Sequence, residues 1–130
     1  MKRMDRMLAY DPMKRLLAPL LFALPIAAAA QAPAKDDGWK SFSFTLEPKK
    51  VHEECQRVEA GQKRRYMWRA DGPVDFNIHY HRGNDVFYPV KREAMRGDGG
   101  TFSAKDGEDY CWLWTAKNAP VKVEGRVESK

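Results

Sequence analysis

Cysteine and histidine are scarce in this 130-residue chain, which contains two cysteines and three histidines, and this limits the chemistry that it can support. No Cys-x-x-Cys motif is present, so Cys55 and Cys111 lack the spacing of a redox-active pair, and redox cycling ranks last among the functions considered. There is also no Gly-x-Ser-x-Gly sequence and no phosphate-binding loop. We therefore expect a protein that is not an enzyme.

Long apolar runs are missing as well, apart from one near the N-terminus. Residues 13–30 read MKRLLAPLLFALPIAAAA, in which two basic residues precede an apolar segment and a set of small residues. This order is typical of a secretory signal peptide, and the apolar segment is short for a membrane span. Pro19 and Pro25 disfavour the alternative, a retained anchor helix.

The signal peptide sets the expected boundaries of the parts of the chain. Small residues before Gln31 suit cleavage there, so residues 1–30 are interpreted as the signal peptide, with Met13 as an alternative true start. Residues 31–38 are expected to form a polar linker, and residues 39–130 a single domain. We expect a periplasmic or secreted protein with no stable membrane anchor after cleavage.

A large excess of one charge is also missing once the signal peptide is removed. The chain has a net charge of +5, but residues 1–30 hold five of its 23 basic residues and two of its 18 acidic residues. The remaining 18 basic and 16 acidic residues give a net charge of +2, so we expect no nucleic-acid partner. The basic run Lys63, Arg64 and Arg65 is interpreted as the solvated start of a strand.

Helical periodicity is not evident after residue 38. Short β-rich runs are instead separated by Gly, Pro, Asn and Asp, which predicts an all-β fold, a single antiparallel β-sandwich of about eight short strands. The expected strands are 39–46, 50–58, 63–70, 74–81, 85–90, 100–104, 109–115 and 120–128. A tight hairpin turn is expected at 82–85 and a glycine-rich turn at 97–100. Residues 91–96 are compatible with a single helical turn, which is too short to matter for the fold.

Alternation of side chains assigns the two faces of each strand. In the strand 74–81, one face is apolar and forms the core, namely Val74, Phe76, Ile78 and Tyr80, and the other carries Asp75, Asn77, His79 and His81. Further core positions are Phe42, Phe44, Leu46, Val121, Val123 and Val127. The strand 109–115 is apolar on both faces, so we expect it to be central or partly covered. Gly125 marks a candidate bulge in the last strand.

An even number of cysteines in an exported domain predicts one disulfide, between Cys55 and Cys111, which ties an early strand to a late strand across the sandwich. Closing a loop of this size stabilises a fold by roughly 4 kcal/mol in the chain-entropy model. The alternative, two thiolate ligands of a metal, is weaker because neither cysteine belongs to a paired zinc-type motif.

Two long segments resemble the GOLD (Golgi dynamics) domain. They read VEAGQKRRYMWRADGPVDFNIHYH and GTFSAKDGEDYCWLWTAKNAPVKVEGRV, and together the resemblance covers about residues 40–128. It implies a β-sandwich that binds other molecules and performs no chemistry, and the pairing of Cys55 with Cys111 matches the disulfide of the secretory cargo-receptor branch. The sequence departs from that branch in having no coiled coil and no C-terminal membrane helix, so a cargo-receptor role is not implied.

The pair His79-x-His81 is the sharpest candidate for a metal site. Two residues on one face of a strand lie close enough for both imidazoles to bind one ion, copper first and zinc second, with Met67 as a soft donor for copper. The candidate third ligands are His52, Asp85, Glu93 and Met95, or a residue of an adjacent strand. In the alternative interpretation, both histidines belong to a solvated face.

Tyr110, Trp112 and Trp114 share one face of their strand and are a candidate ligand-binding strip, with core packing as the alternative. The leading functional hypothesis is an exported, non-enzymatic binding module for a protein or envelope ligand. The alternative is a periplasmic protein that binds copper or zinc through His79 and His81.

Overall fold

The computed structural model describes residues 36–130, which contain six strands and no helix. The strands are β1 Trp39–Leu46, β2 Val51–Val58, β3 Lys63–Arg82, β4 Asp85–Ser103, β5 Glu108–Ala116 and β6 Val121–Glu128. The expected all-β antiparallel fold is confirmed. The predicted signal peptide and most of the predicted linker lie outside the described residues.

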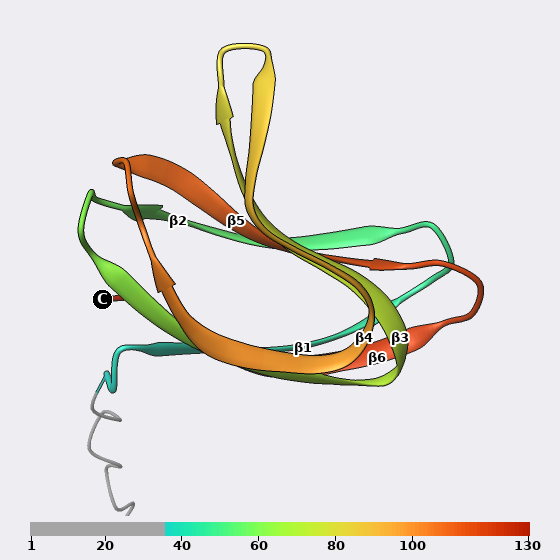
Figure 1. Ribbon diagram of the computed structural model, residues 1–130. Helices are drawn as coiled ribbons and strands as arrows, with labels where there is room; N and C mark the ends of the chain where they lie inside the picture. The colour runs from blue at the N-terminus through green and yellow to red at the C-terminus, as the bar shows by residue number, and fades with distance from the viewer. Residues whose placement is uncertain (1–35) are drawn as a thin grey trace, which may run out of the picture. The chain divides into compact units, whose positions relative to one another are not determined.

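The six strands form one antiparallel sheet that folds over into two layers (Figure 1). The first layer contains β1, β6 and the first half of β3, in which residues 66–70 pair with β6. The second layer contains β2, β5 and the second half of β3, in which residues 74–79 pair with β5. Because β4 pairs with β3 in both halves, β3 and β4 pass from one layer into the other and make the sheet a β-sandwich.

The predicted count of eight strands is wrong because two pairs of predicted strands are continuous. Residues 63–70 and 74–81 both belong to β3, and 85–90 and 100–104 to β4. The residues between them are kept extended by pairing of β3 with β4, and register shifts around Val74 let both strands bend. The glycine and proline residues that the sequence pattern interpreted as breaks between strands therefore lie at bends inside continuous strands.

The expected helical turn at 91–96 and glycine-rich turn at 97–100 are also wrong, since both segments are strand residues of β4. The backbone N–H of Ala94, a residue with a positive φ of 50°, donates to Oδ1 of Asp75 on β3 at 3.0 Å. At Gly97, a Cβ atom would lie 3.0 Å from the carbonyl oxygen of Trp68. Glycine here allows close approach of two strands.

The core lies between the two layers and confirms the predicted inner faces. Val74, Phe76, Ile78 and Tyr80 are all buried. Phe76 packs against Trp68 of the first layer, with ring centroids 5.2 Å apart. Burying each side chain of this size contributes about 1.5–3 kcal/mol, and tilted aromatic pairs add about 0.5–1.5 kcal/mol.

Gly125 is paired in regular register with Phe42 of β1 and Trp68 of β3, so the predicted bulge is wrong. A Cβ atom at this position would lie 2.5 Å from the carbonyl oxygen of Met67 and 2.7 Å from the side chains of Phe42 and Trp68. The absence of a side chain at Gly125 therefore makes room for two core aromatic rings.

The basic run at the start of β3 is only partly solvated. Lys63 and Arg65 are exposed, but Arg64 is buried, which corrects the interpretation of the whole run as solvated. The guanidinium group of Arg64 donates to Oε1 of Gln56 at 3.0 Å and to the carbonyl oxygen of Lys63 at 2.9 Å. These hydrogen bonds give the N–H donors of the buried guanidinium group the partners that a buried charged group needs.

Candidate functional site

The hairpin formed by β3 and β4 extends beyond the rest of the sandwich (Figure 1). Pairing between β3 and β5 ends at His79, whereas pairing between β3 and β4 continues to Arg82 and Asp85. The predicted tight turn is confirmed, with Gly83 and Asn84 at its centre and φ of 61° at Gly83, where glycine carries no steric cost. The end of the hairpin is therefore a two-stranded ribbon with no third strand beside it.

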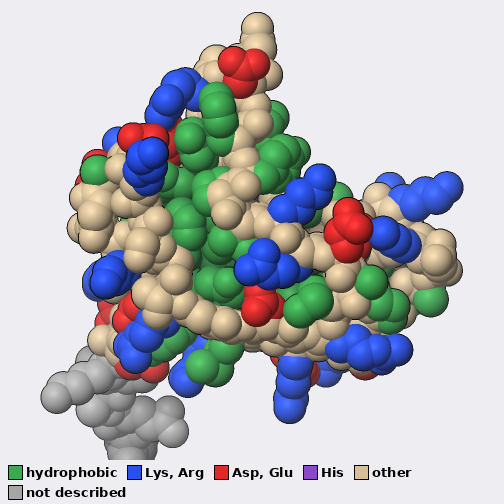
Figure 2. Space-filling model, viewed as in Figure 1, with side chains coloured by type: hydrophobic (Ala, Val, Ile, Leu, Met, Phe, Trp, Pro, Cys, Tyr) green, Lys and Arg blue, Asp and Glu red, His purple; other side chains and the backbone are tan. Residues whose placement is uncertain are grey.

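Apolar side chains are exposed along this ribbon. Val86, Phe87 and Tyr88 are 38%, 40% and 52% exposed, and hydrophobic side chains gather on the hairpin in Figure 2. Successive residues of a strand point to opposite faces, so apolar groups are presented on both sides of the ribbon. Exposed clusters of this kind commonly mark interaction sites. We refer to residues 82–88 as the apolar hairpin.

Contacts at its base hold the apolar hairpin in place. Nη2 of Arg82 donates to Oε1 of Glu108 on β5 at 2.6 Å. The ring of Phe87 stacks on Tyr80, with centroids 5.0 Å apart, and the Arg82 guanidinium lies 5.6 Å from the centroid of Tyr80. These contacts order the hairpin before any ligand binds, which lowers the entropic cost of recognition.

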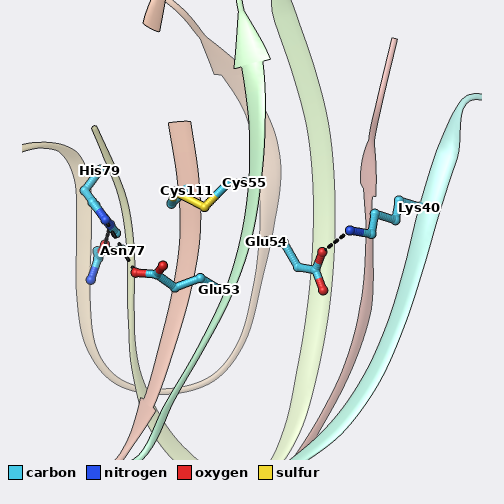
Figure 3. Close-up of a disulfide and its surroundings, with 7 residues drawn as sticks. All are labelled: Lys40, Glu53, Glu54, Cys55, Asn77, His79 and Cys111. Atoms are coloured by element: carbon cyan, nitrogen blue, oxygen red, sulfur yellow. Dashed lines mark hydrogen bonds and ion pairs between the residues drawn. A yellow bond between two sulfur atoms is a disulfide. The ribbon is translucent and has the colours of Figure 1, made fainter. Parts of the chain in front are cut away.

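A second group of side chains lies on the outer face of the second layer (Figure 3). Cys55 of β2 is directly opposite Cys111 of β5, and Cys111 is directly opposite His79 of β3. The predicted disulfide is present, with Cα atoms 4.0 Å apart. Its predicted course across the sandwich is wrong, because it joins neighbouring strands of one layer on the face opposite Trp112 and Trp114.

His79 is buried, with 4% of its surface exposed. Its Nδ1 lies 2.8 Å from Oδ1 of Asn77, and because a carbonyl oxygen only accepts hydrogen bonds, Nδ1 is the donor. Its Nε2 lies 3.6 Å from Oε1 of Glu53 (Figure 3). Burial lowers the pKa of His79, the Glu53 carboxylate raises it and His81 lowers it, so the net shift of the pKa is downward. The neutral imidazole therefore directs an Nε2 lone pair toward a carboxylate.

The predicted histidine pair shares one face, and its ring centroids are 5.2 Å apart. The alternative of two solvated histidines is wrong for His79, which is buried, whereas His81 is exposed. His52, a candidate third ligand, stacks on Phe44 with centroids 3.8 Å apart and bonds Glu54 at 2.8 Å. It lies on the inner face of β2, away from the pair.

The remaining candidate ligands do not complete a site either. Within residues 36–130, no group of three closely spaced His, Cys, Asp or Glu side chains contains His79, His81, Asp85 or Glu93. Met95, the remaining candidate, packs against the core. The three potential ligands that do lie together are Glu53, Cys55 and Cys111. A copper or zinc site built on the histidine pair remains a prediction.

Tyr110, Trp112 and Trp114 are fully buried, so their role as an exposed ligand-binding strip is wrong and the core alternative is confirmed. The strand itself, β5, lies between β2 and β3, as its two apolar faces predicted. Its outer-face residues, Cys111, Leu113 and Thr115, are half-buried.

Sequence reasoning missed the exposed segment 86–88 and the residues Glu53 and Asn77. The sequence pattern places the apolar segment in an ordinary strand, and the predicted turn at 82–85 does not by itself show that this strand end projects beyond the sheet. Asn77 shares the face of His79 at a spacing of two, which is a usable signal for a hydrogen bond. No signal places Glu53 beside His79, because β5 separates their strands.

Comparison with known proteins finds likenesses of fold and none of sequence. No family model matches the chain, and no curated protein matches it. Among solved structures, the pre-peptidase C-terminal domain of a collagenase from Bacillus anthracis is similar, with a TM-score of 0.52 and 13% identity over 68% of this chain and 88% of that one.

The Aeromonas hydrophila protein PliG, a periplasmic inhibitor of g-type lysozyme, aligns with a TM-score of 0.49 and 13% identity over 73% of this chain and 89% of that one. A fold does not by itself determine a function, and neither identity reaches a level at which residues can be equated. The likeness to the pre-peptidase C-terminal domain concerns the fold alone, and it agrees with the all-β sandwich formed by the described strands.

Proposed function

We propose that the protein is an exported, non-enzymatic β-sandwich binding module that recognises a protein partner in the cell envelope or outside the cell. The observation that carries this proposal is the apolar hairpin, a ribbon that extends past the sandwich and exposes Val86, Phe87 and Tyr88. Export is supported by the signal-peptide pattern of residues 13–30 and by the disulfide, which is typical of oxidising compartments.

The shape of the hairpin favours a protein partner over a small molecule. Small ligands are usually bound in concave pockets that bury most of their surface, whereas the exposed apolar groups here lie on both faces of a projecting element. Such an element can bury both faces at once by entering a groove of a partner. Aromatic side chains such as Phe87 and Tyr88 contribute large contact areas at low cost in side-chain entropy.

A role without catalysis is part of the proposal and is supported by the resemblance to the GOLD domain, which implies binding without chemistry.

The proposal is tested by placing a photo-crosslinking amino acid at Val86, at Tyr88 and, as a control, at Val51, in the full chain expressed with its signal peptide. Val51 is also apolar and 57% exposed, but it lies on β2. We expect positions 86 and 88 to crosslink to the same protein and position 51 not to do so.

Calorimetry with that purified partner then measures the contribution of the hairpin. We expect the double variant Val86→Ser with Tyr88→Ser to weaken binding at least about tenfold, because hot-spot residues cost more than about 1 kcal/mol each when truncated, and Val51→Ser to leave binding unchanged. Equal crosslinking at all three positions, or full affinity in the double variant, would show that the hairpin is not the recognition element.

A further inference from the structure

We propose that reduction of the disulfide creates a site for a divalent transition metal ion, Zn²⁺ or Co²⁺, whose ligands are the Cys55 and Cys111 thiolates, the Glu53 carboxylate and the His79 imidazole. This inference is independent of the apolar hairpin, and it uses His79 without His81. It follows from the order of strands in the second layer, β3-β5-β2, which brings one potential ligand from β3, one from β5 and two from β2 to the same outer face.

Three of the donor atoms lie together, and the fourth adjoins one of them. The ligand atoms of Glu53, Cys55 and Cys111 all lie within 4.8 Å of one another. Nε2 of His79 is not part of this group but lies 3.6 Å from Oε1 of Glu53. In a tetrahedral zinc site the ligand atoms are about 3.3–3.8 Å apart, as follows from bond lengths of about 2.0–2.3 Å. In the reduced chain, separation of the two sulfurs and rotation of the Glu53 and His79 side chains would bring the set into that range. Figure 3 shows Glu53 and His79 pointing toward one another beside the disulfide.

The orientation of His79 fits a ligand role. Because Nδ1 donates to Oδ1 of Asn77, Nε2 is the ring nitrogen that faces the Glu53 carboxylate. A histidine ligand whose other nitrogen is fixed by a hydrogen bond is the usual arrangement in metal sites.

The disulfide determines whether the site exists. A disulfide sulfur is not a thiolate, so the oxidised protein offers this site only Glu53 and His79. A phosphine reductant and one water molecule convert the disulfide into two thiols and the phosphine into its oxide, which balances two electrons and two protons. Binding of a divalent ion then displaces the two thiol protons to solvent. Cys55 is exposed, so a reductant can reach the bond.

The test is a titration of the purified full chain with Co²⁺ and Zn²⁺, with and without a phosphine reductant, which supplies no competing thiol. Charge transfer from thiolate to Co²⁺ gives an absorption band that reports directly on sulfur ligation. We expect this band, with one ion per chain, in the reduced protein only, and its displacement by Zn²⁺. Cys55→Ser and Cys111→Ser should each remove at least half of its intensity.

The other two ligands are tested with Glu53→Gln and His79→Gln, each of which should weaken Zn²⁺ binding more than about tenfold, and with Asn77→Ala, a positioning residue, which should weaken it about tenfold. His81→Gln is the matched control and should bind normally. Full affinity in both Glu53→Gln and His79→Gln, or loss of binding in His81→Gln, would overturn the proposal.

Folding of the reduced chain is followed by near-ultraviolet circular dichroism, to which the buried tryptophans contribute. If reduction alone abolishes the native signal, we expect added Zn²⁺ to restore it, because metal binding to the native site stabilises the native state. A reduced chain that stays folded without a thiolate band, or that stays unfolded in the presence of Zn²⁺, would contradict the proposed site.

Discussion

Nε2 of His79 lies 3.6 Å from Oε1 of Glu53, although the two residues belong to strands that are separated by β5. The two side chains reach toward each other over the outer face of β5, beside the Cys55–Cys111 disulfide (Figure 3). Burial nevertheless outweighs the carboxylate and lowers the pKa of His79. His79 therefore contributes to the folded state as a neutral imidazole.

The first prediction concerns pH. Because the pKa of His79 is lower in the folded chain than its ordinary value of 6.5, the unfolded chain binds the proton more readily. The stabilising contribution of His79 is complete above about pH 6.5 and is lost as the pH falls through the lowered pKa of the folded state. We expect the free energy of unfolding of the wild type to fall more steeply between pH 7 and 5 than that of His79→Gln.

Urea unfolding at a series of pH values measures this difference. Val51→Ser serves as the control, since Val51 is exposed and neither side chain titrates, so the variant should keep the wild-type slope. A wild type and a His79→Gln variant with the same slope would show that His79 titrates as it does in the unfolded chain.

The second prediction concerns the disulfide. The double variant Cys55→Ser with Cys111→Ser should lose about 2–4 kcal/mol of unfolding free energy, because the disulfide spans 56 residues and restricts the unfolded chain. Its native fold should persist, since the cysteines lie on an outer face and the core is built from other residues. Denaturant unfolding of wild type and variant gives the difference, and an unchanged midpoint would contradict it.

The third prediction concerns Gly125. Replacement by alanine places a methyl group 2.5 Å from the carbonyl oxygen of Met67 and 2.7 Å from Phe42, so we expect Gly125→Ala to destabilise the fold by about 1–3 kcal/mol or more. Gly100→Ala on β4 is the matched control, because its nearest neighbour would be the Tyr66 hydroxyl at 4.0 Å. Thermal unfolding compares the two, and equal melting temperatures would exclude the steric role.

The fourth prediction separates two neighbouring arginines. Arg64→Ala removes a buried side chain and its hydrogen bond to Gln56, with an expected loss of about 1.5–3 kcal/mol. Arg65→Ala removes an exposed ion pair with Glu128, in which Nη2 and Oε1 are 2.8 Å apart, and should cost less than about 1 kcal/mol. Chemical denaturation of both variants measures the contrast, and a larger loss for Arg65→Ala would reverse the assignment of burial.

The part of the fold that could be predicted from the sequence is the part set by local alternation. The inner faces of the strand that carries Phe76 and Ile78 follow from a period of two, and so does the common face of His79 and His81. The hairpin turn follows from Gly83 and Asn84, whose residue types suit it. All of these depend on residues close together in the chain.

The features that could not be predicted depend on which strands become neighbours. Cys55 and Cys111 belong to adjacent strands of one layer, and alternation alone cannot distinguish this arrangement from a bridge between layers. The continuity of β4 through 91–100 depends on its pairing with β3, which overrides the local preference for turns. For the same reason Arg64, in a run that reads as solvated, is buried.

The passage of β3 and β4 through both layers has a consequence for how the domain opens. In a sandwich whose layers are joined only by loops, one layer can unfold while the other persists. Here both layers contain part of the β3–β4 ladder, the longest hydrogen-bonded ladder of the described chain. Unfolding of one layer would therefore disrupt half of this ladder, and the other layer depends on the same two strands. We therefore expect local opening to be confined to the outer strands β1 and β2 and to the tip of the hairpin, and the amide hydrogens of the remaining strands to exchange in one cooperative unit.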